Sequence, residues 1–432
     1  MRRMFHAAHL VAARIVTARI VTARIVAAFF IAAPLTACGS YSGGMPEINF
    51  YYPPEQSLAR IVDGCTAQAD GRYRIVYQVL PRSADDQRTQ MVRRLAAEDT
   101  GMDVMGLDVT WTQEFASAKW ILPWTGARRA EVERGTLAGP LESAKYQGML
   151  YAAPKNTNTQ LLWYRTDLVH RPPATWDEMI AMAQRLKSGR KPYQVITMGA
   201  QYEGLVVLFN TLVASAGGHI LNAEGTRAVL DAGAVKALSV LHRFATSGVT
   251  DASFTNAQED EARLRFQAGH GAFQLNWPFV YPAMAKAAPE LARKVRWARY
   301  PGIYPGVPSR VTIGGTNLAV SRFSPHPDLA FEAAACIRSA ENQFYSGITD
   351  GVPPTIESVY SRPEMAYAYP MRDAILAELK EPAIRPRTPA YQNVSTVISA
   401  LLSPPSAIEP RRTADEMRES LQEALESRGV LP

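Results

Sequence analysis

Hydrophobic and polar positions follow two different rhythms in the first quarter of the chain. Alternating or β-rich runs stop at a proline or an acidic residue, as strands do, and the stretches between them place apolar residues on one face of a helix. This alternation of strand and helix predicts βαβ units and a parallel sheet, which is an α/β fold. The predicted strands lie at 47–52, 73–80 and 102–107, and the predicted helices begin near 58 and span 85–98.

Polar and aromatic side chains gather where these three strands end. A parallel sheet binds ligands beyond the carboxyl ends of its strands. Those ends are residues 52–56, 81–83 and 108–111. This edge of the sheet is therefore the first candidate for a binding site.

The rest of the chain continues to mix strands and helices, with less regular spacing. Thr175 followed by Glu178 has the pattern of a helix N-terminus. Residues 301–317 are rich in Gly, Pro and Tyr and lead into an apolar strand. Further strands are predicted at 161–164, 271–275 and 317–320, and further helices at 176–187, 204–216, 235–244, 259–268, 328–339 and 413–427.

The N-terminus has the order of an export signal: two arginines, an apolar run at 25–37, and small residues before Cys38. This arrangement resembles a bacterial lipobox. The resemblance implies that residues 1–37 are a lipoprotein signal peptide, that Cys38 carries lipid, and that the mature chain is tethered to the outer face of the cell membrane. An ordinary signal peptide with a chance cysteine is the alternative. The repeat at 13–26 puts arginines where a signal is usually apolar, which leaves the true start of the chain open.

Composition indicates an ordinary globular protein with two domains or one large one. The 432 residues are 47% hydrophobic and 20% charged. The formal charge of +6 comes in part from the first 37 residues, which hold several arginines and no acid. No block of Lys and Arg alternates with aromatics, so nucleic acid is not an expected partner. No segment after the signal has the roughly 18 consecutive apolar residues of a membrane helix.

Three cysteines have to be assigned. If Cys38 carries lipid, Cys65 and Cys336 are left as an even pair in an oxidising compartment, and we predict a disulfide between them. The alternative is two buried free thiols, because a free cysteine commonly serves as a small core residue.

Six longer stretches carry a family resemblance. With the lipobox, they resemble the extracytoplasmic sugar-binding proteins of ABC importers, and within that family the trehalose-binding lipoproteins. The resemblance covers essentially the whole mature chain. The stretches are VMGLDVTWTQEFA (104–116), APKNTNTQLLWYRTDLV (153–169), EGLVVLFNTLVASAGG (203–218), LNWPF (275–279), VTIGGTNLAV (311–320) and AIRPRTPAYQ (383–392).

The resemblance implies a periplasmic-binding-protein-like fold, in which two α/β lobes flank a ligand cleft and are joined by hinge crossovers near residues 155 and 315. Closure of the lobes is a hinge motion, and the pair Gly314-Gly315 can absorb the change in backbone angles that it needs. A tight turn without motion is the alternative for this pair. The implied lobes are residues 38–155 with 316–380, and residues 156–315 with 381–432, the latter including the C-terminal helices.

A neutral disaccharide needs carboxylates and amides for its hydroxyls and an aromatic platform for its C–H faces, because buried polar groups left unpaired carry a large penalty. The resemblance supports Asp108, Asn158 and Glu203 as polar contacts and Trp277 as the platform. Arg385 lies in a proline-bounded loop and can hold two hydroxyls at once. The predicted ligand-binding residues are Glu55, Gln56, Asp108, Asn158, Glu203, Asn276, Trp277, Gly314, Gly315 and Arg385.

Several of these side chains have a structural alternative. Asp108 can cap the helix that follows it, and Glu55 with Gln56 can be charged or polar residues of a first helical turn. Arg387 competes with Arg385 for the binding role.

Enzyme classes find little support in the sequence. GxSxG, HExxH and Walker patterns do not occur, and the histidines lack metal-ligand spacing, so neither a metal nor a cofactor is expected. Asp108 and Glu203 are the only pair we would nominate for a glycoside hydrolase. We therefore expect a disaccharide, first of all trehalose, as the ligand, and the permease and ATPase subunits of an ABC importer as partners. Maltose, a glycerophosphodiester or a peptide is the alternative cargo.

Overall fold

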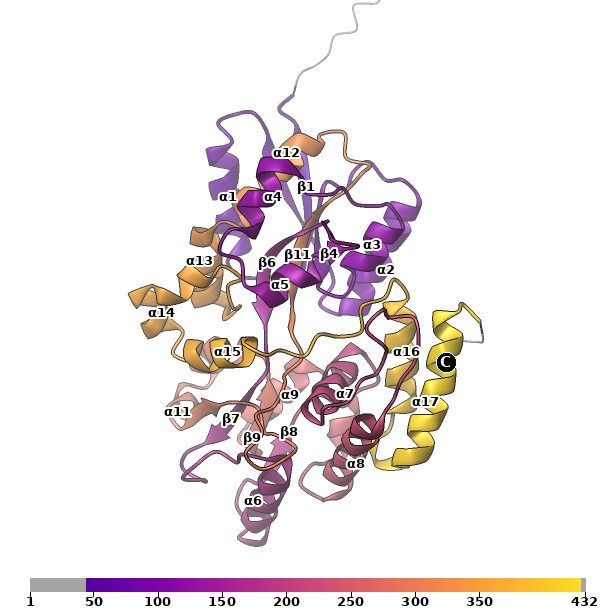
Figure 1. The fold of residues 1–432 in the computed structure, drawn as a ribbon. Coiled ribbons are helices and arrows are strands. Elements are labelled where there is room, and N and C mark those ends of the chain that lie inside the picture. Colours follow the sequence, from indigo (N-terminus) through magenta and orange to yellow (C-terminus); the bar gives the residue numbers. More distant parts are fainter. Residues whose placement is uncertain (1–43, 429–432) are drawn as a thin grey trace, which may run out of the picture. The chain divides into compact units, whose positions relative to one another are not determined.

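Two sheets, each covered by helices, build the part of the chain that the computed structural model describes, residues 44–428 (Figure 1). From Met45 onward the chain forms one compact unit. The predicted signal at 1–37 and the predicted lipid site Cys38 lie outside the described residues. Within residues 44–428, no helix has the length and apolar character that a bilayer crossing requires.

The first sheet joins strands from distant parts of the chain. Its strands are β1 (Glu47–Tyr52), β2 (Arg74–Val79), β3 (Val104–Asp108), β6 (Ala153–Asn158) and β11 (Gly314–Val320). β1 pairs in parallel with β2 and β3, which confirms the predicted parallel start. β11 inserts antiparallel between β3 and β6, so the order is β2-β1-β3-β11-β6. Apolar side chains of these strands form one core with α1 (Leu58–Gln68), α2 (Ala84–Ala96) and α12 (Pro327–Ile337).

The second sheet comes from the middle of the chain and has the order β10-β7-β9-β8. Its strands are β7 (Leu161–Arg165), β8 (Gln194–Ile196), β9 (Gly271–Asn276) and β10 (Val295–Ala298). One core joins this sheet to α6 (Trp176–Ser188), α7 (Glu203–Ser215), α8 (Ala232–Thr246), α16 (Tyr391–Leu401) and α17 (Pro410–Leu425). The Thr175 side chain accepts a hydrogen bond from the backbone N–H of Glu178 at 3.2 Å, which confirms the predicted start of α6.

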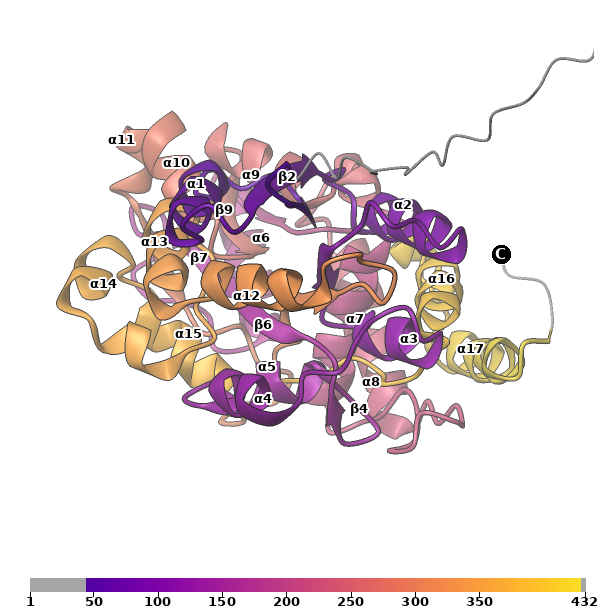
Figure 2. The same cartoon turned by 90° about the horizontal axis from the view of Figure 1, so that it is seen from above.

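A further hydrophobic cluster joins the same sheet to α9 (Glu259–Gln267), α10 (Val280–Ala287), α14 (Pro363–Ala368) and α15 (Arg372–Leu379). In both ribbon views α14 and α15 lie on one flank and α16 and α17 on the opposite one (Figures 1 and 2). The predicted first lobe includes residues 316–380, and the apolar side chains of α14 and α15 nevertheless join this cluster of the second sheet. The lobe boundaries stay a prediction.

The chain first passes between the sheets at polar residues. β6 ends at Asn158, and β7 follows after Thr159 and Gln160, which are both fully buried. The resemblance implies a crossover near residue 155, yet the strand continues to Asn158. It does so because its amides find partners in the sheet: the backbone N–H of Thr316 donates to the Asn156 side chain at 2.9 Å. The shorter elements are α3 (Thr112–Ser117), α4 (Gly126–Glu133), α5 (Ala138–Ser143), β4 (Lys145–Tyr146), β5 (Met149–Leu150), α11 (Pro289–Ala292) and α13 (Ala340–Asp350).

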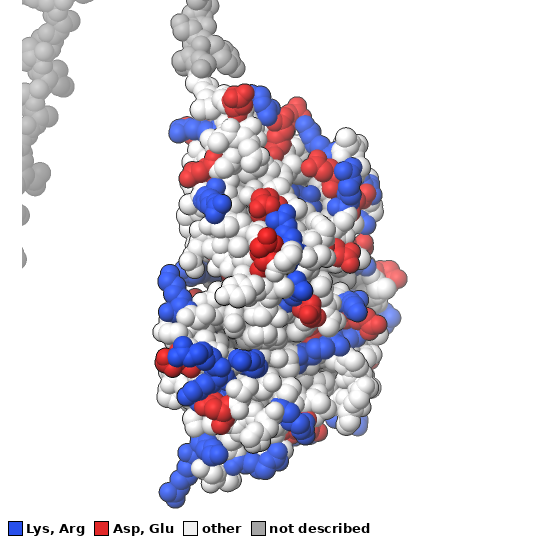
Figure 3. Space-filling model, turned by 90° about the vertical axis from the view of Figure 1, so that its left-hand side faces the viewer, with Lys and Arg blue, Asp and Glu red and all other residues white. Residues whose placement is uncertain are grey.

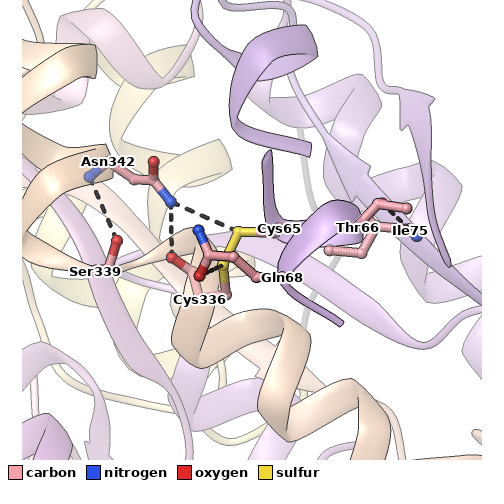
Figure 4. The surroundings of a disulfide bond; sticks show 7 residues. All are labelled: Cys65, Thr66, Gln68, Ile75, Cys336, Ser339 and Asn342. Carbon is pink, nitrogen blue, oxygen red and sulfur yellow. Dashed lines mark hydrogen bonds between the residues drawn. A yellow bond between two sulfur atoms is a disulfide. The ribbon is translucent and has the colours of Figure 1, made fainter. Parts of the chain in front are cut away.

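A disulfide joins Cys65 of α1 to Cys336 of α12, which confirms the predicted pairing (Figure 4). The two helices contact each other over the first sheet. Beside the bond, the side-chain amide of Asn342 donates to the Cys336 carbonyl at 2.8 Å. The cysteines are 271 residues apart in sequence, so the bond ties the beginning of the first sheet's core to a segment that follows the whole second sheet.

Charge is distributed unequally between the part of the chain that contains the second sheet and the segments that contain the first sheet. Residues 159–313 hold 17 Lys and Arg against 11 Asp and Glu, whereas residues 44–158 and 314–357 together hold 15 against 19. On the face shown in Figure 3, basic side chains prevail in the lower part, and both signs mix in the upper part. Opposite net charges attract, so the electrostatic field favours the approach of the two parts rather than their separation.

Candidate functional site

A cavity of about 1000 Å³ lies where strand ends of the first sheet face the second sheet and α7. Residues that follow β1, end β3 and follow β9 line it, in keeping with ligand binding beyond the carboxyl ends of strands. Its volume suits a small organic ligand. Nine of the ten predicted residues line it: Glu55, Gln56, Asp108, Asn158, Glu203, Trp277, Gly314, Gly315 and Arg385.

The guanidinium of Arg385 joins carboxylates from the two parts of the molecule. Its Nη1 donates to Glu203 at 2.6 Å, and its Nη2 donates to Asp108 at 3.0 Å. The Arg385 side chain is 3% exposed, Glu203 is 13% exposed and Asp108 is 24% exposed. Burial by itself lowers the pKa of Arg385, but Asp108, Tyr391 and Glu203 raise it overall, so the group stays cationic. Arg385 therefore orients two carboxylates whose remaining lone pairs can accept hydrogen bonds.

The competing Arg387 has a different environment. It is 44% exposed and pairs with Glu142 at 2.5 Å, away from the cavity lining. Of the two arginines, the structure therefore brings Arg385 to the cavity.

Glu203 is the first residue of α7 and is heavily hydrogen-bonded. The Tyr391 hydroxyl donates to it at 2.5 Å, and the Ser395 hydroxyl donates to its other oxygen. Burial raises the pKa of Glu203, whereas Arg385 and the two hydroxyls lower it. Burial has the larger effect, so the net pKa of Glu203 lies above the ordinary 4.5. Since Tyr391 and Ser395 belong to α16, the C-terminal helices help to build the cavity wall.

Glu55 forms a second buried ion pair, on the first sheet's side. Lys155 lies 2.7 Å from it, and the two side chains are 2% and 14% exposed. The Tyr52 hydroxyl donates to the other oxygen of Glu55 at 3.1 Å. α1 begins at Leu58, so Glu55 precedes the helix instead of occupying its first turn. Nothing in the sequence pattern indicated Lys155, because a single lysine beside a proline and an asparagine carries no periodic signal.

Trp277 lies against the segment where the chain re-enters the first sheet. A Cβ on Gly314 would come within 3.0 Å of the indole and 3.4 Å of Asn158. Gly315 has a φ of +131°, and a Cβ there would come within 2.4 Å of the Asn156 carbonyl. Position 315 therefore requires glycine, and a Cβ at position 314 would push the indole away by a few tenths of an ångström, so the pair allows the indole and the two strands to approach closely.

Asn276, the tenth predicted residue, lies behind the cavity wall. It is fully buried, its side-chain oxygen accepts from the backbone N–H of Trp277 at 2.8 Å, and its amide donates to the Glu259 carbonyl at 3.1 Å. The structure thus places Asn276 where it positions Trp277 and α9.

The N-terminus of α9 adds polar wall that the sequence reading did not include. Burial raises the pKa of Glu259, and the Tyr202 and Trp277 side chains lower it in part. Within residues 44–428, Asp260 has Arg263 as its partner, and no ion pair includes Glu259. The available signal was the acidic run at 259–261, which a helix dipole alone explains. The lining residues missed here are Tyr202, Gln258, Glu259, Asp260, Glu261 and Arg263.

The cavity combines carboxylates, amides and one indole, and buried cations pair with the carboxylates of Glu55, Asp108 and Glu203. Such a set accepts hydrogen bonds from hydroxyls and offers an apolar face. No group of three or more His, Cys, Asp or Glu side chains in the described chain is suited to hold a metal ion.

Two sequence comparisons identify relatives of the chain. Residues 69–344 match the family described as bacterial extracellular solute-binding protein. A protein of Deinococcus radiodurans, named a probable ABC transporter-binding protein, is 28% identical over 339 residues, which cover 74% of this chain and 79% of that protein.

Solved structures show the same architecture. Maltose-bound MalE3 of T. maritima matches with a TM-score of 0.80 and 27% identity, over 88% of this chain and 99% of that chain. The GacH receptor of Streptomyces glaucescens, described unliganded and with acarbose, matches with a TM-score of 0.77 and 19% identity, over 89% of this chain and 99% of that chain. The predicted two-lobe α/β fold is thereby confirmed.

Proposed function

We propose that this chain, which belongs to the family of bacterial extracellular solute-binding proteins, captures a disaccharide in its cavity and delivers it to the permease of an ABC transporter. The family places it outside the cytoplasm, and the matched relative in Deinococcus radiodurans carries the name of a transporter-binding protein.

One observation carries the proposal: the bridge Asp108–Arg385–Glu203 at the cavity. Its carboxylates come from β3 of the first sheet and from α7, which packs on the second sheet. A ligand that bonds to both carboxylates gains most when the two parts are close together. Ligand binding and closure are then one equilibrium, as a delivery protein requires.

Trehalose is our first choice of cargo. Six stretches resemble the mycobacterial trehalose-binding lipoprotein LpqY, and they supply Asp108, Glu203, Trp277 and Arg385. The wall offers acceptors for hydroxyls and an indole for a sugar face, and its buried cation Arg385 is already paired with acids. The wall also carries six acidic side chains against four cationic ones, which disfavours a phosphodiester. Maltose is the second candidate, because the matched structure of MalE3 is described as maltose-bound.

Binding without chemical change fits the site better than hydrolysis. The relatives are solute-binding proteins. A glycoside hydrolase needs one carboxyl group to give a proton and the other to act as base or nucleophile. Here one guanidinium donates to both Asp108 and Glu203, so the two carboxyl groups act together as anchored acceptors rather than as a separate acid and base.

Isothermal titration calorimetry with trehalose, maltose and a glycerophosphodiester tests the proposal. We expect heat with trehalose and no breakdown of the sugar after prolonged incubation. If only maltose releases heat on binding, maltose replaces trehalose as the proposed ligand, and the proposed function as a sugar-binding protein stands. Release of glucose from either sugar would favour the hydrolase and overturn the proposal.

Lipid anchoring through Cys38 is a separate proposal, supported by the lipobox pattern. The matched experiment compares Cys38→Ala with the unaltered chain during expression in a bacterium with a lipoprotein pathway. We expect the variant to leave the membrane fraction. Equal retention of both chains in the membrane fraction would contradict the anchor.

A further inference from the structure

Lys155 lies behind the cavity wall and is almost completely buried. Its Nζ is 2.7 Å from Glu55 and 4.7 Å from the centre of the Tyr52 ring. A buried ammonium is costly unless it is paired and hydrogen-bonded. The pair with Glu55 and the aromatic face together meet that requirement.

Tyr52 and Asn156 complete the surroundings of this pair. The Tyr52 hydroxyl donates to Glu55 at 3.1 Å and accepts from the Asn156 amide at 2.9 Å. The Tyr52 ring covers Gly106, where a Cβ would come within 2.3 Å of it. One oxygen of Glu55 is thus held by Lys155 and the other by Tyr52, so the direction of the carboxylate is fixed.

The place of Lys155 in the chain is also informative. It lies on β6, which leads through Thr159 and Gln160 into the second sheet. Arg385, the cation of the other cluster, lies on the segment between α15 and α16. Lys155 therefore belongs to a segment that joins the two sheets, whereas Arg385 lies between two helices that both pack on the second sheet. Each of the two buried cations holds carboxylates that line the cavity.

We propose that Lys155 is a positioning residue of the binding site: without touching the ligand, it holds the Glu55 carboxylate at the cavity wall as a fixed acceptor for a sugar hydroxyl. The inference rests on the proposed function, because it requires a hydroxylated ligand. A carboxylate has about four acceptor sites, so Glu55 keeps capacity for a hydroxyl while it contacts Lys155 and Tyr52.

A double-mutant cycle separates this role from a general effect on stability. Calorimetric titration with trehalose, or with maltose if only maltose binds, is carried out on the unaltered chain, Lys155→Met, Glu55→Gln and the double variant. We expect each single substitution to weaken binding about 10-fold, because the acceptor is either misplaced or replaced by an amide. The double variant should match Glu55→Gln within about threefold, since Lys155 acts through Glu55.

Arg338→Met is the matched control. Arg338 is another buried cation near β6, 4% exposed, and its guanidinium donates to the Pro154 carbonyl at 3.3 Å. It does not line the cavity, so its loss should lower the melting temperature and leave the affinity unchanged. If Lys155→Met fails to fold, the comparison of Glu55→Gln with the double variant still tests the proposal, because a further loss of affinity in the double variant would show that Lys155 does not act through Glu55.

The outcomes separate the two proposals. Losses that multiply in the double variant, or an unaltered affinity of Lys155→Met, would overturn the role of Lys155 while sugar binding stands. Failure of the unaltered chain to bind any sugar of the panel would overturn the proposed function and this inference together.

Discussion

The cavity has two buried cations whose partners differ in number and origin. Arg385 contacts Asp108 of the first sheet and Glu203 of α7, which packs on the second sheet. Lys155 contacts only Glu55, and both of these residues belong to the part of the molecule built around the first sheet. A guanidinium is a planar fork that serves two carboxylates at once, and an ammonium is a compact charge that serves one. Arg385 therefore connects the two halves, whereas Lys155 orients a single acceptor, and each role has a side chain of suitable geometry.

Replacing Arg385 by methionine should have the largest effect on both stability and sugar affinity, and it tests directly whether Arg385 and Lys155 differ in role. The change leaves two carboxylates close together without their cation, so we expect a loss of about 3–5 kcal/mol in the free energy of unfolding. We also expect at least a ~100-fold loss of sugar affinity, clearly more than for Lys155→Met. Urea denaturation and calorimetry measure the two quantities.

Arg387→Met is the control for that variant, because Arg387 lies two residues after Arg385 and makes an exposed pair with Glu142. Its stability should change by less than about 1 kcal/mol. If Arg385→Met bound sugar as well as Arg387→Met does, the bridge between the halves would have no part in binding.

Trp277→Ala should have the next largest effect on affinity. It compares the contribution of the indole with that of the ion bridge at Arg385. Loss of a large aromatic contact should weaken binding by about 1.5–3 kcal/mol, which is roughly 10- to 150-fold. Trp277→Phe keeps a ring and should lose less. An affinity loss larger than that of Arg385→Met would show that the indole, and not the ion bridge, dominates recognition.

The pH dependence of binding should distinguish the two cations by a smaller effect. The pKa of Glu203 lies above 4.5, so the charged acceptor is lost, and affinity falls, as the pH decreases through that raised pKa. Arg385→Met should move this fall to higher pH, because Arg385 lowers the pKa of Glu203. Glu203→Gln should flatten it. A profile of Lys155→Met that shifts as far as that of Arg385→Met would contradict the separation of tasks.

The same group affects stability with the opposite sign. Since burial raises the pKa of Glu203 in the folded chain, the folded state holds the proton more tightly than the unfolded state. Its contribution to the free energy of unfolding is complete below about pH 4.5 and is lost as the pH rises through the folded pKa. Denaturation of Glu203→Gln across this range measures the contribution.

The smallest expected effect on binding belongs to the disulfide. Changing Cys65 and Cys336 to alanine should lower the free energy of unfolding by about 2–5 kcal/mol. The affinity should change less than twofold, since neither residue lines the cavity. Parallel titration and urea denaturation test both statements, and a clear loss of affinity would show that the first sheet's core is not a rigid support.

Periodicity predicted those parts of the fold in which apolar positions repeat. β1, β2, α6 and α9 lie within one or two residues of their predicted bounds, because burial on one face alone decides them. β6 reads as a linker, since its polar side chains gain their partners only from residues far along the chain, such as Thr316. The same reason hides Lys155 from sequence reading: its role depends on Glu55, a hundred positions away.

The binding residues divide in a similar way. Asp108 and Trp277 stand at strand ends, where topology alone directs attention. Arg385 reached the candidate set through its loop, but its two carboxylate partners follow only from the three-dimensional arrangement. The LNWPF stretch predicted both Asn276 and Trp277 as binding residues, but only Trp277 lines the cavity. A sequence motif alone does not show which of two neighbouring side chains faces a ligand.

The insertion of β11 between β3 and β6 has a consequence for biosynthesis. A ribosome that has reached residue 310 has already made every strand of the second sheet, but the first sheet still lacks its fourth strand. Until Gly314–Val320 emerges, β3 and β6 keep open hydrogen-bonding edges that invite pairing with other chains. A gene fragment that stops there also lacks α14 to α17, which complete the cores of the second sheet, so we expect neither half to fold from it. Any attempt to express the first half alone has to supply the missing strand by circular permutation.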